Sequence, residues 1–134
     1  METNKGVETF YAKTRVQWRK WLQKNSQSKK EVCLILYNKG SDTKSVTYAE
    51  AVEEALCFGW IDSLTNKRDE ESRYQRFSPR KPNSNWSKSN IERVERMIKE
   101  GLMTEQGQKL IDFAKQKGMW NQLLGVKAFK LPNF

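Results

Sequence analysis

The chain has 134 residues, with 25 Lys and Arg against 16 Asp and Glu and no histidine, which gives a net charge of +9. The length fits one domain with a buried core. The lack of histidine excludes Ser-His and Cys-His nucleophile pairs, His-containing metal sites and an imidazole pH switch. Two cysteines are too few for a four-thiolate metal site. We therefore predict neither a metal nor a cofactor.

The apolar runs and the cysteines predict where the protein resides. The first thirty residues hold no apolar run of signal-peptide length, and the longest such run, Val32–Tyr37, is far too short to span a membrane. Cys33 and Cys57 each lie among apolar neighbours, which predicts buried free thiols and a reducing compartment. We expect a cytoplasmic protein.

The N-terminal part of the chain predicts a helix followed by a strand. Residues 1–9 indicate a loose start. Thr14 and Gln17 form a capping-box pattern that begins a helix running to about Asn25. The continuous apolar run over 32–37 is typical of a buried strand.

A second capping box, Thr47 with Glu50, begins the next predicted helix, which ends at Gly59. Small and aliphatic residues form its inward stripe. Its acidic residues, Glu50, Glu53 and Glu54, are expected on a solvated face.

The C-terminal part predicts a β-hairpin and two helices. Residues 60–78 form the hairpin, which Pro79 and Pro82 end. The first helix begins at Ser87 or Ser89 and is ended by Gly101. The second begins at Thr104 or Glu105 and is ended by Gly118.

These elements together predict the α+β class. A small antiparallel sheet, made of the 32–37 strand and the 60–78 hairpin, is covered by about four helices. The apolar residues from Trp120 onward predict a tail that folds back onto the body. We expect a single domain over 1–134, with 1–9 and 121–134 peripheral.

The strongest local pattern runs from Arg76 to Asn90, where a predicted strand ends, two prolines stiffen the connection and a helix begins. The stretch Ser72–Ile91 holds five basic residues and no acid. Arginines facing the free N–H groups of a helix start suit a phosphate or carboxylate. The ligand-binding residues predicted here are Trp60, Asp62, Arg76, Arg80, Trp86, Ser87 and Asn90.

The same residues also allow a purely structural interpretation, in which Arg80 bridges to Asp62, Trp86 lies in the core and the serines only cap. Two other functions stay open. The basic surface and the five tryptophans suit nucleic-acid binding. A carboxylate-based hydrolase would combine Asp62 with Glu53 or Glu54.

Three blocks of sequence resemble a known family. They are Ala55–Ser63, Arg76–Arg80 with Ser84–Asn90, and Gly101–Met103. Together they resemble the bacteriocin-protection, YdeI/OmpD-associated family, over about residues 10–120. The resemblance implies a small bacterial stress or resistance protein without assigned catalytic residues. The signature positions are Gly59, Trp60, Asp62, Arg76, Pro79, Arg80, Trp86, Ser87 and Asn90.

Overall fold

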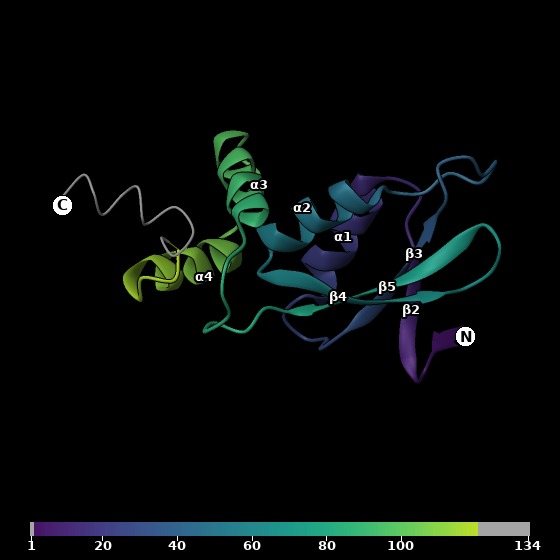
Figure 1. The fold of residues 1–134 in the computed structure, drawn as a ribbon, viewed down its shortest axis with the longest axis horizontal. Coiled ribbons are helices and arrows are strands. Elements are labelled where there is room, and N and C mark those ends of the chain that lie inside the picture. Colours follow the sequence, from purple (N-terminus) through teal and green to yellow (C-terminus); the bar gives the residue numbers. More distant parts are fainter. Residues whose placement is uncertain (1, 121–134) are drawn as a thin grey trace.

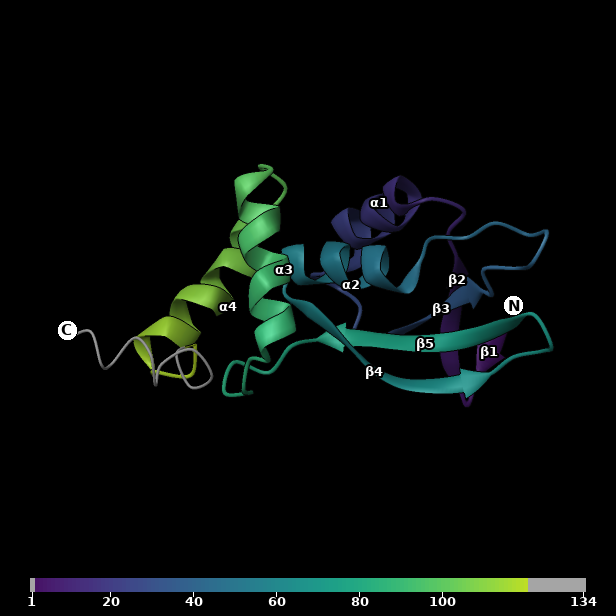
Figure 2. The ribbon, with the colours of Figure 1, turned by 45° about the horizontal axis from the view of Figure 1, so that its top comes forward.

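A computed structural model describes residues 2–120, which form one five-stranded sheet and four helices and so confirm the α+β class (Figure 1). Helices α1 and α2 lie on one face of the sheet, and α3 and α4 form a pair at one end of it (Figure 2). The elements in chain order are β1 Thr3–Asn4, β2 Val7–Tyr11, α1 Arg15–Asn25, β3 Val32–Tyr37, α2 Tyr48–Cys57, β4 Trp60–Lys67, β5 Ser72–Pro79, α3 Lys88–Lys99 and α4 Glu105–Gln116.

The N-terminal segment corrects the predicted loose start. β1 and β2 form a hairpin in which Asn4 pairs with Val7. The two loop residues between them, Lys5 and Gly6, both have positive φ angles, as a two-residue hairpin loop of this kind requires. Val7–Tyr11 forms a strand because the tight turn and the neighbouring strands stabilise its extended conformation.

The sheet is mixed, where the sequence predicted an antiparallel one. The strand order is β1-β2-β3-β5-β4, and β2 runs parallel to β3 while the other pairs are antiparallel. The helix α1 provides the crossover that returns the chain to the starting edge of the sheet, so that β3 runs in the same direction as β2. The predicted strand at 32–37 and the predicted hairpin are both present, as β3 and β4–β5.

Local capping signals place the helix starts. The hydroxyl of Thr14 accepts a hydrogen bond from the backbone N–H of Gln17, and Thr47 and Glu50 form a complete capping box. Ser87, one of the two predicted starts, caps α3, and Thr104 caps α4. Gly59 ends α2 with φ +76°, a conformation that side chains with a Cβ rarely adopt.

The core lies between the sheet and the helices. Trp18 and Trp21 of α1 stack with ring centroids 5.4 Å apart, and Trp18 also contacts Phe77 of β5. Cys33 and Cys57 are buried and free, as predicted. The predicted tail from Trp120 lies outside the described residues, apart from Trp120 itself, which is buried. Within residues 2–120, no helix is long and apolar enough to cross a membrane.

Candidate functional site

The predicted site residues Arg80 and Trp86 come together, but as a buried pair. The guanidinium carbon of Arg80 lies 3.9 Å from the Trp86 ring centroid, and Arg80 Nη2 donates to the carbonyl oxygen of Asn85. Trp86 also contacts Trp120, with centroids 5.1 Å apart. Burial lowers the pKa of Arg80 to about 10, although the nearby Asp62 charge opposes the shift. These contacts give both residues a structural role, but the partners of Arg80 are Trp86 and the carbonyl oxygen of Asn85 in place of the predicted Asp62.

Asp62, Arg76 and Trp60 each bind a different partner. The hydroxyl of Tyr48 donates to Asp62 Oδ2 at 2.6 Å, where the sequence predicted Arg80 as the partner. Arg76 forms an ion pair with Glu31, which immediately precedes β3. Trp60 is buried, and its indole N–H donates to the carbonyl oxygen of Ser26.

Ser87 and Asn90 act in the first turn of α3. Ser87 Oγ accepts a hydrogen bond from the backbone N–H of Asn90, and Asn90 Oδ1 accepts one from Arg93. The structure therefore brings Arg80 next to Trp86 and Ser87 next to Asn90. It directs Arg76 toward Glu31, so that the two arginines have separate partners.

Glu53 and Glu54 correct the prediction of a solvated acidic face. Both are buried, and Glu54 accepts from Arg15 at 2.7 Å and from Arg19 at 2.8 Å. Glu53 forms ion pairs with Arg15 and with Arg96 of α3. Burial would raise the pKa of Glu53, but the hydrogen bonds from its two arginines outweigh burial and hold that pKa below its ordinary value.

The predicted hydrolase pair is therefore occupied with other partners. A general acid needs a raised pKa, whereas that of Glu53 is lowered. Asp62 is hydrogen bonded to Tyr48. The physical reason for the misplaced acidic face is that α1 and α3, which supply the arginines, lie far from α2 in the sequence.

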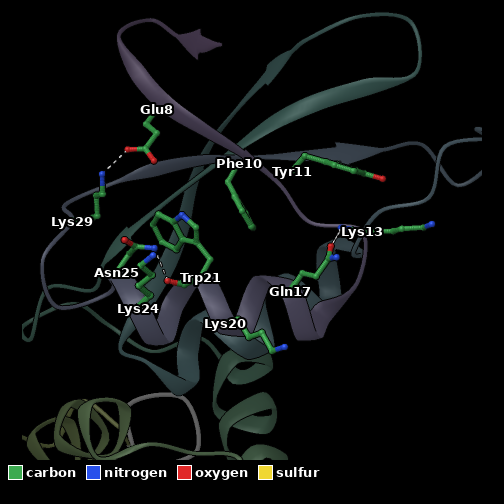
Figure 3. Close-up of a pocket in the computed structure, with 10 residues that line it drawn as sticks. All are labelled: Glu8, Phe10, Tyr11, Lys13, Gln17, Lys20, Trp21, Lys24, Asn25 and Lys29. Carbon is green, nitrogen blue, oxygen red and sulfur yellow. Dashed lines mark hydrogen bonds and ion pairs between the residues drawn. The ribbon is translucent and has the colours of Figure 1, made fainter. Parts of the chain in front are cut away.

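A groove between β2 and α1 collects a different set of residues (Figure 3). Its volume is about 700 Å³, within the range of small-ligand sites. Phe10 of β2 and Trp21 of α1 form its apolar floor, with ring centroids 6.0 Å apart. Tyr11 closes one side, and its hydroxyl donates to the carbonyl oxygen of Lys44. We call this the β2–α1 groove.

Four lysines surround the floor of the β2–α1 groove: Lys13, Lys20, Lys24 and Lys29. Glu8 is the one carboxylate among the lining residues, and Lys29 Nζ contacts it at 2.8 Å. The groove therefore carries an excess of positive charge. An anion that entered it would meet ammonium groups above an aromatic surface.

Two amide side chains complete the β2–α1 groove. Gln17 Oε1 accepts from the backbone N–H of Lys13, which leaves its amide N–H₂ to donate. The amide nitrogen of Asn25 donates to the carbonyl oxygen of Trp21, which leaves its Oδ1 to accept. The groove thus offers a donor and an acceptor as well as charge.

One side of this groove has a signal in the sequence. Gln17, Lys20 and Lys24 recur at helical spacing, so they form a row about 10 Å long on one side of α1. Such a row is ordinarily a solvated face. It becomes part of a concave site because β2 lies opposite, and β2 falls partly in the segment predicted to be loose.

A family model described as a domain of unknown function, DUF8412, matches residues 10–110. The chain belongs to the DUF8412 family. The matched part of this DUF8412 chain begins at Phe10 in the groove floor and contains all four groove lysines. Comparisons with curated proteins and with solved structures gave no match. The resemblance to the bacteriocin-protection family stays a prediction.

Proposed function

We propose that this DUF8412 domain is a non-enzymatic binder of a small anionic ligand that carries a phosphate or carboxylate group. The observation that carries the proposal is the β2–α1 groove, where four lysines surround an aromatic floor and the one lining carboxylate is already paired with Lys29. Ammonium groups bind phosphates as point charges, and the floor suits a flat or apolar portion of the ligand.

The composition of the groove favours binding over catalysis. Its lining residues include no Ser, Thr or Cys nucleophile. The Tyr11 hydroxyl donates a hydrogen bond to a backbone carbonyl, and Glu8 forms an ion pair with Lys29. A nucleophile beside an available base is the usual arrangement for covalent catalysis, and these ten lining residues do not form one.

Two free buried thiols support a cytoplasmic location, which we propose with the binding function. For both cysteines burial is the main cause of a raised pKa, to about 11 for Cys57. The thiols are therefore protonated near neutral pH and have a structural role. Within a bacterial cell, an anion binder of this kind agrees with the resistance-type role that the family resemblance implies.

Isothermal titration calorimetry at low salt tests the proposal. The probes are inorganic pyrophosphate, citrate and thymidine monophosphate, and the test variant is Lys20→Gln with Lys24→Gln. The matched control is Lys99→Gln with Lys109→Gln, which removes the same charge from exposed positions on α3 and α4.

We expect wild type and control to bind at least one probe, and the groove variant to bind it about tenfold more weakly for each lysine that contacts the anion. Added salt weakens the binding because the site is exposed. The proposal fails when no probe releases heat with the wild type, or when the groove variant and the control bind equally.

A further inference from the structure

A second basic cavity adjoins the β2–α1 groove. It has a volume of about 500 Å³ and is formed by the loop between β3 and α2 together with the ends of β3 and β5. Its lining residues include three cations, Lys39, Lys44 and Arg73, and no Asp or Glu. Among residues 2–120, none of these three side chains forms an ion pair. We call it the loop pocket.

The two cavities meet at Tyr11. Tyr11 lines the β2–α1 groove, and its hydroxyl donates to the carbonyl oxygen of Lys44, which lines the loop pocket. Its ring also contacts Tyr37 of the loop pocket edge-on, with centroids 5.7 Å apart. Tyr11 is 41% exposed, so a ligand that lies across it reaches both cavities.

The joined cavities fit a long ligand better than a compact one. A small anion occupies one cavity and leaves the cations of the other unneutralised. Along α1, the row Gln17, Lys20 and Lys24 alone extends about 10 Å, and Arg73 and Lys44 continue the positive charge beyond Tyr11. Repeated cations along a path are complementary to a chain of regularly spaced negative charges.

Aromatic and amide groups along the path distinguish between classes of polyanion. Phe10, Trp21, Tyr11, Tyr37 and Tyr48 line the two cavities together with the cations, and Tyr11 and Tyr48 are the exposed rings among them, at 41% and 38%. Rings beside cations are the chemistry that holds single-stranded nucleic acid, because every base has a face that stacks. The free amide groups of Gln17 and Asn25 match the donor and acceptor edges of bases. An acidic peptide carries the negative charges but lacks the bases that would stack on these rings.

We propose that a single-stranded nucleic acid binds along the β2–α1 groove, across Tyr11 and into the loop pocket. The phosphates lie against the lysines and Arg73, and bases lie against the exposed rings. This proposal rests on the proposed function, because a mononucleotide in the groove is the smallest unit of the same contact. A flexible strand enters both cavities, whereas the bases of a duplex are already stacked on one another.

Fluorescence anisotropy with labelled oligothymidylates tests the path. The oligonucleotides have lengths of about 4 and about 16 nucleotides, the range that single-strand-binding modules cover. The variants are Lys20→Gln with Lys24→Gln in the groove, Lys44→Gln with Arg73→Gln in the loop pocket, and the control Lys99→Gln with Lys109→Gln. A duplex of the longer sequence and a polyglutamate peptide are the competitors.

We expect the longer strand to bind more tightly than the shorter one. The groove variant weakens both strands, and the loop-pocket variant weakens the longer strand more than the shorter. Each of these two variants lowers the slope of log affinity against log salt by about 1.4, since each contacted phosphate contributes about 0.7 for single strands. The control leaves affinity and slope unchanged.

Three results overturn the proposal and differ from failure of the proposed function. If the loop-pocket variant and the control bind the longer strand equally, the strand does not extend from the β2–α1 groove into the loop pocket. Equal competition by the duplex shows non-selective charge attraction, and equal competition by polyglutamate shows an acidic protein partner. When the oligonucleotides fail but thymidine monophosphate still binds, the groove function stands alone. Failure of every probe removes both.

Discussion

The guanidinium carbon of Arg80 lies 3.9 Å from the centre of the Trp86 ring, and both side chains are buried. Arg80 Nε has no hydrogen-bond partner among the described residues, and Nη2 donates only to the carbonyl oxygen of Asn85. Burial of this charge lowers the pKa of Arg80 to about 10. The fold thus holds a buried charged group that is placed on the face of the Trp86 ring and donates one hydrogen bond to a backbone carbonyl.

Replacing Arg80 by methionine tests what that charge contributes. Arg80→Met keeps a long apolar side chain against Trp86 and removes the cost of burying a charge. We expect the free energy of unfolding to stay within about 1 kcal/mol of wild type or to rise, whereas Trp86→Ala lowers it by about 3 kcal/mol. Urea denaturation measures both. A loss with Arg80→Met as large as that with Trp86→Ala would show that the charge itself stabilises the fold.

Glu54 of α2 links this helix to α1 through two ion pairs. Its side chain is 3% exposed and accepts from both Arg15 and Arg19. We expect Glu54→Gln to lower the free energy of unfolding by about 2 kcal/mol, less than for a fully buried pair because both arginines are partly exposed. The control is Glu70→Gln at an exposed pair with Lys67, where we expect a change below about 0.5 kcal/mol. Similar losses in the two variants would contradict this account.

Gly107 allows α4 to approach the end of α2. A Cβ at this position would lie 2.6 Å from the carbonyl oxygen of Cys57 and 2.7 Å from that of Leu56. Alanine ordinarily favours a helix over glycine, yet here we expect Gly107→Ala to lower the free energy of unfolding by about 1–3 kcal/mol. Thermal melting, with Gln108→Ala on the same helix as the control, measures the effect. A rise in the melting temperature would contradict the close approach.

The N-terminal strand responds to acid through Glu2. Hydrogen bonds from Arg68 and then from Tyr74 lower the pKa of Glu2 from 4.5 to about 2. A carboxyl with a lowered folded-state pKa stabilises the fold above its unfolded pKa, and this contribution is lost as the pH falls. We expect the stability difference between wild type and Glu2→Gln to be largest above pH 4.5 and to vanish toward pH 2. Denaturation at several pH values measures it, and a difference that stays constant from pH 7 to pH 2 would contradict the role of Glu2.

Local signals predicted most of the fold. The Thr14 and Thr47 caps, the apolar run of β3, the hairpin at 60–78 and the Gly59 stop each depend on a few neighbouring residues, and each is present in the structure. β2 was missed because its only strong local cue is a short alternating segment after a two-residue turn. Without β2, neither the parallel pairing nor the β2–α1 groove was predictable.

The amino-acid sequence by itself determined the charge excess, the lack of histidine chemistry, the approximate helix boundaries and the burial of both cysteines, because these follow from composition and short-range pattern. Only the tertiary structure decided which charged side chains form ion pairs with one another and which remain open to solvent. Glu54 and Arg19 are distant in sequence, as are Lys24 and Phe10 on their separate elements. The same residue types form a partly buried ion pair in one place and an open basic groove in another, and the difference is which element packs opposite them.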